Sequence, residues 1–389
     1  MKTALSPTTD HDPKMRFNLR ELSGSLGDLG TFLPLTLALA YATGLNLGWM
    51  LIAAGLMNIA SGVLFRIPIP VQPMKAIAAV AIAEGLSGGA VVASGWVMGG
   101  VLTLIAVTGL IHWIDRLIPR PVVRAIQLGV GLKLAWSGLT WVSELPVLGA
   151  NSVVIAILIG VVLLVGVLRS WPIVLPVFLA GFAILAIDHQ GAYSALRLGW
   201  PELQWIVPTG DDWGAGLIHG VLPQLPLTIL NSVIAVCALS GDYFPKRAIT
   251  PKRMALSVGL MNLLCVGWSG MPMCHGAGGL AAQVRAGARS GGSVVMLGIA
   301  KVLVGVALGV SLLPLLLHYP TAVLAPLVGI AGLSLAHAGI CTTHKTDWLA
   351  TLPAAAVILF TQTLYGFIVG VILVVLIRWL HLCADRADQ

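Results

Sequence analysis

Long apolar stretches without charged residues follow one another along most of the chain. Residues 29–65, 145–168, 254–284, 302–344 and 348–377 contain no Asp, Glu, Lys or Arg. A helix needs about 20 apolar residues to cross the hydrocarbon core of a bilayer, so several of these stretches can hold two spans. They do not alternate polar with apolar positions as the strands of a transmembrane barrel do. The pattern therefore predicts an all-α polytopic membrane protein.

Hydropathy places about fourteen transmembrane segments along the chain. They cover residues 21–43, 46–65, 71–85, 91–114, 121–142, 150–168, 171–188, 215–239, 252–269, 275–289, 292–317, 321–340, 346–360 and 361–381. The third and tenth segments are too short to cross a bilayer unaided. The composition agrees with this class, because only 10% of the residues are charged, whereas a soluble domain carries about 25%.

The basic residues predict the orientation of these segments. With the N-terminus inside the cell, the predicted inner side holds Lys2, Lys14, Arg16, Arg20, Arg66, Arg116, Arg120, Arg124, Arg169, Lys246, Arg247, Lys252, Arg253, Arg285, Arg289, Lys345, Arg378 and Arg386. The longest outer loop, 189–214, has one Arg against one Glu and two Asp. This asymmetry predicts an inner or plasma membrane protein with both termini cytoplasmic. It also explains the net charge of +7 without a nucleic-acid partner. The first twenty residues have no apolar centre, so we expect no cleavable signal peptide.

Two matching interruptions break the hydrophobic pattern, one at residues 67–75 and one at residues 270–279. The prolines of the first remove backbone donors and favour extended chain. The glycines of the second allow the backbone to approach a ligand closely. Extended chain at membrane depth is tolerated only inside the protein or along a cavity. We predict that helices Met74–Glu84 and Leu280–Arg289 follow the interruptions, and paired interruptions of this kind indicate a transporter's binding site.

The start of each of these helices would offer unpaired N–H groups and partial positive charge, which together favour an anion. Lys75 lies in the first turn of one helix and His275 at the start of the other. A ligand anion explains a lysine at that position, because the helix alone disfavours a cation there. The alternatives are an ion pair of Lys75 with Asp28 or a snorkelling side chain, and for His275 a neutral, hydrogen-bonded histidine of the interior.

A short repeated motif relates the two halves of the chain. Leu33–Thr36 has the sequence LPLT, which recurs as Leu225–Thr228. A repeat of seven spans enters the membrane from the opposite face in its second copy, so we predict an inverted repeat. Gln224, Thr228 and Asn231 share one helix face in the second copy, where amide and hydroxyl groups suit an oxyanion. The alternative is that they form helix–helix hydrogen bonds.

Four more charged residues lie within or beside the apolar runs. Asp28 is a candidate proton carrier, a partner for Lys75, or a cap near the inner interface. Glu84 closes the short third segment at the outer interface and is a second candidate for proton coupling, as is His275. Lys133 and Lys301 either line the pathway or snorkel, and we favour snorkelling.

Four ordered motifs resemble the molybdate transporter family of the sulfate permease superfamily. They are Gly27–Phe32, Pro70–Ala76, Pro223–Asn231 and Cys274–Leu280. The resemblance implies a fold of fourteen segments in two inverted repeats of seven, shared with sulfate and nucleobase permeases. It further implies half-helices in segments three and ten, with the substrate between their N-termini. A C-terminal regulatory domain of the kind found in typical sulfate permeases is not expected.

The resemblance also divides the chain into a core domain that moves against a gate domain. The predicted core domain is 21–114 plus 215–317, and the predicted gate domain is 121–188 plus 321–381. Along the chain we expect a cytoplasmic N-terminal tail (1–20), the first repeat (21–188), an extracytoplasmic loop (189–214), the second repeat (215–381) and a cytoplasmic C-terminal tail (382–389). A homodimer through the gate domain is left open.

Together these features predict a secondary active transporter that imports a tetrahedral oxyanion, with molybdate first. A sulfate permease and a nucleobase permease are the alternatives. Import of a dianion into a negative-inside cell costs ~2.3 kcal/mol per charge per 100 mV of membrane potential. We therefore hypothesise that import is coupled to protons. The expected substrate-binding residues are Thr31, Gln72, Met74, Lys75, Gln224, Thr228, Asn231, Cys274, His275, Gly276, Ala277 and Gly278. We expect no catalytic residue, metal or cofactor, because Cys274 beside His275 is the one nucleophile–base pair at the interruptions and sequence neighbours seldom face each other.

Overall fold

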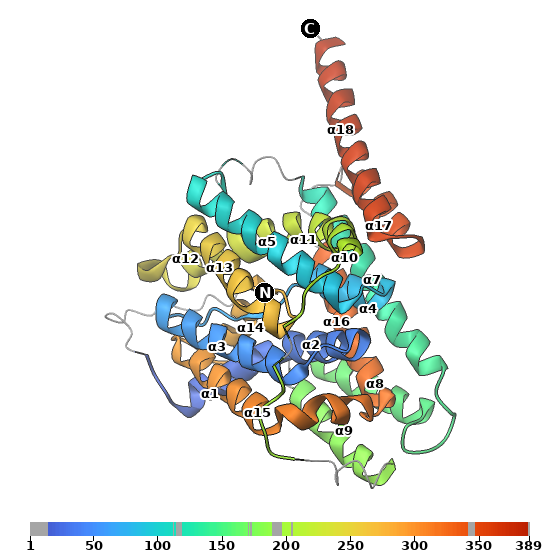
Figure 1. Ribbon diagram of the computed structural model, residues 1–389. Coiled ribbons are helices and arrows are strands. Elements are labelled where there is room, and N and C mark those ends of the chain that lie inside the picture. The colour runs from blue at the N-terminus through green and yellow to red at the C-terminus, as the bar shows by residue number, and fades with distance from the viewer. Residues whose placement is uncertain are drawn as a thin grey trace.

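A computed structural model of the chain describes residues 15–111, 113, 119–169, 171, 173–188, 197–203, 205–340 and 347–387. Within these residues the fold is helical apart from one pair of two-residue strands. Most of the predicted N-terminal tail, part of the loop 189–214 and the last two residues lie outside the described residues. Figure 1 shows the helices gathered into one bundle, beyond which the last helix, α18, extends.

The elements follow the apolar stretches of the sequence. In the first half they are α1 (Leu19–Ser25), η1 (Leu26–Asp28), α2 (Leu29–Thr43), α3 (Leu47–Phe65), β1 (Gln72–Pro73), α4 (Lys75–Glu84), α5 (Gly88–Thr108), α7 (Arg120–Ser143), α8 (Val153–Leu168) and α9 (Val174–Asp188). In the second half they are α10 (Gly210–Ala215), η3 (Gly216–Val221), α11 (Leu222–Leu227), η4 (Thr228–Ile234), α12 (Ala235–Tyr243), η5 (Pro245–Arg247), α13 (Pro251–Ser269), β2 (Met273–Cys274), α14 (Ala277–Arg285), α15 (Gly292–Leu317), α16 (Thr321–Ile340), α17 (Trp348–Phe360) and α18 (Thr363–Ala387).

Each of the fourteen predicted segments overlaps at least one of these helices. By length and composition, six helical stretches of the described residues are able to cross a membrane. They are Leu19–Thr43, Leu47–Phe65, Gly88–Thr108, Gly210–Tyr243, Gly292–Leu312 and Thr321–Ile340. Four shorter apolar helices accompany them, at Val153–Leu168, Val174–Ile187, Trp348–Phe360 and Thr363–Trp379. The chain is therefore a helical membrane protein.

The eighth segment is longer than predicted, because one continuous helical stretch runs from Gly210 to Tyr243. It begins at a capping box in which Thr209 and Asp212 bond each other's backbone N–H groups, a start signal that the hydropathy pattern does not contain. Two π-helical turns, η3 and η4, flank the prolines of α11. Proline removes a backbone donor from the ladder, and π turns often mark functional sites.

The bounds of α4 were predicted more accurately from the sequence than those of α14. α4 begins at Lys75, one residue later than predicted. α14 runs over Ala277–Arg285 instead of Leu280–Arg289. It ends early because Gly287 adopts a positive φ of 115° that breaks the helix, which glycine permits without a steric penalty.

Helix pairs drawn from the two halves form the interior of the bundle. α3 packs along α15, α5 along α13, and α7 along α16 and α17. Between α3 and α15 the contact is close enough that a Cβ added to Gly55 or to Gly298 would meet the backbone of the facing glycine. Small residues let helix backbones approach in this way inside membranes.

The two interruptions pair with each other in the interior of the bundle. β1 and β2 are antiparallel, with Gln72 opposite Cys274 and Pro73 opposite Met273. The N–H of Met74 donates to the carbonyl of Pro272 at 2.8 Å, which extends this contact. The starts of α4 and α14 therefore lie beside one another although about half the chain separates them.

Candidate functional site

Two buried asparagines hold the extended segments that precede α4 and α14. The Oδ1 atom of Asn58 on α3 accepts from the N–H of Val71 at 2.8 Å. The Oδ1 atom of Asn262 on α13 accepts from the N–H of Met273 at 2.8 Å, and its Nδ2 donates to the Met273 carbonyl at 2.7 Å. Buried backbone groups outside a helix need such partners. Neither asparagine was among the expected site residues, although each is a polar residue in the mostly apolar helix before an interruption.

Gln224 caps the start of α4 from another helix. Its Oε1 atom accepts from the N–H groups of Ala76 at 2.8 Å and Ile77 at 3.2 Å. Its Nε2 atom donates to the hydroxyl of Thr228 at 2.7 Å. Two of the free donors of α4 are therefore already satisfied by protein. The contacts of Gln224 are the helix–helix hydrogen bonds that were the alternative to a substrate contact.

Lys75, the first residue of α4, is only partly buried. Within the described residues it forms no hydrogen bond and no ion pair, so the expected alternative of a pair with Asp28 is not formed. Met74, which precedes it, is 1% exposed, and Cys274 across the strand pair is buried with its Sγ 3.9 Å from the carbonyl oxygen of Pro73. Met74 and Cys274 thus pack behind the helix start while the Lys75 ammonium is left unpaired.

The start of α14 is open on one side. Gly276 occupies the N-cap position and no side chain caps the helix. Ala277 is buried, whereas Gly278 is exposed, and a Cβ added to Gly278 would meet no atom within 4 Å. The first turn of α14 therefore presents its backbone to free space, which suits a ligand that accepts hydrogen bonds from N–H groups.

Asp28 and Gln72 lie against the other side of the same turn. The Nε2 atom of Gln72 donates to Oδ1 of Asp28, while Asp28 Oδ2 and Gln72 Oε1 have no partner in the described structure. Gly276 and Gly279 make room for them, because a Cβ at either position would collide with this pair. A buried carboxylate with an unsatisfied oxygen thus lies directly behind the helix start.

His275 is completely buried. Its Nδ1 lies 2.9 Å from the carbonyl of Pro70 and its Nε2 lies 2.9 Å from the hydroxyl of Ser257. A carbonyl only accepts, so Nδ1 carries the hydrogen and, in the neutral ring, Nε2 accepts from Ser257. Since both ring nitrogens are engaged, the interior histidine that was the alternative describes His275 better than a ligand does.

Comparison with known proteins places the chain in a family. A family model described as molybdate transporters of the MFS superfamily matches residues 20–134 and 216–335. Molybdate transporter 2 and Molybdate transporter 1 of Arabidopsis thaliana are 37% and 36% identical to the chain; the alignments cover 92% and 94% of this chain and 87% and 89% of theirs. The chain belongs to this molybdate transporter family. The resemblance carried by the four sequence motifs is confirmed, and so is the prediction of a transporter rather than an enzyme.

Two solved structures with the same fold are described as a bicarbonate transporter and an anion transporter. The transmembrane domain of the cyanobacterium bicarbonate transporter BicA has a TM-score of 0.63 at 17% identity, covering 90% of this chain and 97% of that chain. The murine Solute Carrier 26 family member A9 anion transporter, in its inward-facing state, has a TM-score of 0.65 at 13% identity, covering 95% of this chain and 69% of that chain. At these identities the likeness concerns the fold alone. This member of the molybdate transporter family is therefore an integral membrane anion transporter with a Solute Carrier 26-like fold.

In this member of the molybdate transporter family, Lys133 and Lys301 do not snorkel as expected. Lys133 Nζ lies 2.9 Å from Glu84 Oε1, and the same carboxylate oxygen accepts from the N–H and hydroxyl of Thr363. Lys301 is 5% exposed, with Nζ 3.3 Å above the ring centre of Phe32. Both ammonium groups are held inside the protein, because an ion pair and a cation–π contact replace the water that a snorkelling lysine seeks.

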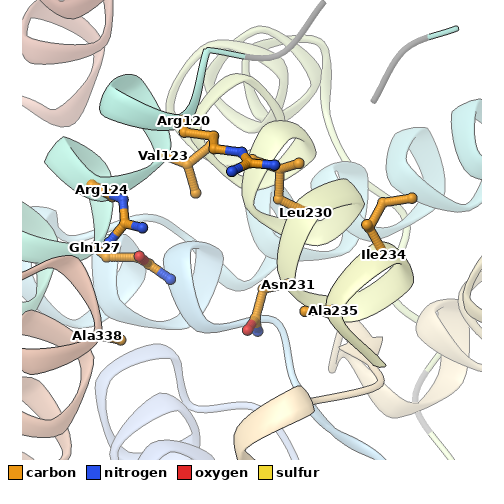
Figure 2. Close-up of a pocket in the computed structure, with 9 residues that line it drawn as sticks. All are labelled: Arg120, Val123, Arg124, Gln127, Leu230, Asn231, Ile234, Ala235 and Ala338. Atoms are coloured by element: carbon orange, nitrogen blue, oxygen red, sulfur yellow. The ribbon is translucent and has the colours of Figure 1, made fainter. Parts of the chain in front are cut away.

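The last two predicted site residues, Thr31 and Asn231, lie on cavity walls. Asn231 lines a cavity of about 400 Å³ together with Arg120, Arg124 and Gln127 of α7 (Figure 2). Thr31 lines another, of about 500 Å³, which Arg285 of α14 also reaches. In the sequence these arginines indicate only the orientation of the segments, and no motif marks them as cavity residues.

Proposed function

We propose that this protein is a secondary active transporter that imports a tetrahedral oxyanion, with molybdate as its first substrate, by alternating access. The observation that carries the proposal is the antiparallel pairing of β1 with β2, which brings the starts of α4 and α14 together beside the unpaired ammonium of Lys75. Helix N-termini carry partial positive charge and free donors, and a basic side chain adds full charge. This combination favours a compact dianion.

The substrate would contact Lys75 and the first turn of α14. Gln224 already occupies two of the α4 donors, so α4 contributes mainly its lysine and its dipole. The backbone of Gly278 faces free space and supplies N–H donors from the other side. Gln72, whose Oε1 has no partner, would position the turn from behind. His275 is left out of the proposed site.

Molybdate and sulfate share charge and shape, so the site chemistry does not distinguish them. The names of the relatives favour molybdate. A nucleobase permease is less well supported by the chemistry. It would need carboxylates that read the edge of a base at the two helix starts, whereas the charged residue in the first turn of α4 is Lys75. Asp28, the nearby carboxylate, is 1% exposed and bonded to Gln72.

Coupling to protons would run through Asp28. A dianion entering a negative-inside cell opposes the field by ~2.3 kcal/mol per charge per 100 mV, so a co-transported cation is needed. Asp28 Oδ2 has no hydrogen-bond partner among the described residues, and the carboxylate lies against the start of α14. The other two candidates are engaged elsewhere, Glu84 with Lys133 and Thr363 and His275 through both ring nitrogens, so the proposal uses neither. The positive-inside rule supports cytoplasmic termini in an inner or plasma membrane.

Several corresponding features support an inverted repeat with separate core and gate domains. Asn58 and Asn262 play the same part before the two short helices. α3 and α13 also end alike, because Arg66 and Gly270 both adopt left-handed φ values, 57° and 70°. The antiparallel strand pair has the direction that two inverted copies would give. A homodimer through the gate domain remains a prediction that crosslinking in membranes would test.

The decisive experiment is uptake of labelled molybdate into proteoliposomes that carry an inward proton gradient. We expect saturable uptake that sulfate reduces and uracil leaves unchanged. Replacing Lys75 with Met should abolish uptake, while Lys75→Arg, which keeps the charge, should retain part of it. Inhibition by uracil together with indifference to both oxyanions would overturn the proposal. Size-exclusion profiles of both variants control for folding.

A further inference from the structure

The cavity beside Asn231 lies between two helices that the site itself does not use together. α7 supplies one wall through Arg120, Arg124 and Gln127, and the helix formed by η4 and α12 supplies the other. Figure 2 shows the side chains of α7 directed towards the space that Asn231 faces from the opposite wall. Lys75 does not line this cavity, so it is distinct from the proposed transport site.

No acidic residue of the described chain lines this cavity. Arg120 and Arg124 form no hydrogen bond and no ion pair within the described residues, and no Asp or Glu is among the lining residues. The two arginines are one turn apart on α7, with Gln127 in the next turn, so all three share one face. Like charges at this spacing destabilise a helix. An anion between the guanidinium groups would reverse that cost, and their planar donors match an oxyanion with paired hydrogen bonds.

One helix face connects the cavity with the proposed transport site. Gln224, whose Oε1 caps α4, donates through Nε2 to Thr228. Asn231 follows Thr228 by one further turn and lines the cavity. This helix face therefore runs from the residue that caps α4 to the wall of the cavity.

We propose that Arg120, Arg124, Gln127 and Asn231 form a second oxyanion site, which holds the transported anion between the Lys75 site and the cytoplasm. The inference rests on the proposed function and names a further site for the same substrate. Arg124 and Gln127 belong to the predicted gate domain, Arg120 immediately precedes it on the same helix, and Asn231 belongs to the predicted core domain. The complete site therefore exists only while these domains stand as they do in this structure, and it disassembles when the core domain moves.

Binding stoichiometry tests the second site directly. Isothermal titration of purified protein with sodium molybdate should give two sites per chain. The double variant Arg120→Gln, Arg124→Gln should give one, and Lys75→Met should also give one, because each removes a different site. Arg169→Gln, at the exposed end of α8, is the matched control and should keep two sites. A single site in wild type that Lys75→Met removes would overturn the second site and leave the proposed function intact; no molybdate binding in any protein would overturn the proposed function.

Transport from the cytoplasmic side gives a second readout. In proteoliposomes whose arginine-rich side is accessible, the double variant should lower the rate of molybdate loading at sub-saturating concentration by about tenfold, because focused charge raises local anion concentration by at least that factor. The difference should shrink at high salt. An unchanged rate would overturn the proposal. Phosphatidylcholine vesicles should give the same result as vesicles containing phosphatidylglycerol; a second site lost only with phosphatidylglycerol would mean that the arginines hold a lipid headgroup instead.

Discussion

The Nζ atom of Lys133 lies 2.9 Å from Oε1 of Glu84, and this ion pair joins the end of α4 to the middle of α7. Their side chains are 16% and 8% exposed, so the pair is largely shielded from water. Glu84 Oε1 also accepts hydrogen bonds from the N–H and the hydroxyl of Thr363 at the start of α18. The contact therefore ties the predicted core domain to two helices of the predicted gate domain.

Breaking this ion pair should destabilise this conformation. Glu84→Gln and Lys133→Met should each lower the free energy of unfolding, and a double-mutant cycle should give a coupling of about 0.5–3 kcal/mol, as for residues in contact. The swapped pair Glu84→Lys, Lys133→Glu should recover more uptake than either charge reversal alone. Thermal unfolding in detergent and proteoliposome uptake measure the two effects. Glu144→Gln, at an exposed position, is the control, and additive effects of the two substitutions would contradict the prediction.

The two asparagines before the short helices should contribute unequally to stability. Asn262 bonds both the N–H and the carbonyl of Met273, and also the carbonyl of Val258. Asn58 accepts only from Val71, and its Nδ2 has no partner in the described structure. Each buried group left unsatisfied costs about 1–3 kcal/mol. Asn262→Ala should therefore lower the thermal midpoint more than Asn58→Ala, and the reverse order would contradict the structure.

The three glycines at the start of α14 should differ in their tolerance of a methyl group. A Cβ at Gly276 or Gly279 would collide with the Gln72–Asp28 pair, whereas one at Gly278 would meet nothing. Overpacking of this kind costs about 1–3 kcal/mol. We expect Gly276→Ala and Gly279→Ala to lower the thermal midpoint and reduce uptake. Gly278→Ala should fold as well as wild type but raise the KM for molybdate, because its methyl group occupies the open space. A wild-type KM would place the anion elsewhere.

Two substitutions of Gln224 distinguish the structural role of the α4 cap from its electrostatic role. Gln224→Leu leaves the N–H groups of Ala76 and Ile77 unpaired and should cost about 1–3 kcal/mol of stability. Gln224→Glu keeps the acceptor and adds negative charge at a helix start, which is worth about 0.3–1 kcal/mol to the helix. That charge repels an oxyanion, so uptake should be lost without loss of stability. Exposed Gln362→Glu should change neither, and full uptake by Gln224→Glu would remove the anion from this helix start.

Local sequence features were sufficient to predict the helical membrane fold and the two interruptions. Stretches free of charge predicted the helices, and proline before Lys75 predicted the start of α4 within one residue. These properties depend on neighbouring residues only, since proline fixes its own φ and removes its own donor. The family was equally legible, because its motifs are contiguous runs of sequence.

The partners of the buried polar groups were not predictable in the same way. Gln224 was expected to face the substrate but caps α4, which lies 148 positions away in the chain. His275 was expected beside the ligand but bonds Pro70 and Ser257, and Lys133 was expected to snorkel but binds Glu84. Hydropathy predicts that a residue lies in the membrane, but it does not predict how the helix is rotated about its own axis. That rotation follows from how small residues such as Gly55 and Gly298 let helices approach, and it is the packing of distant helices that assigns each buried donor its acceptor.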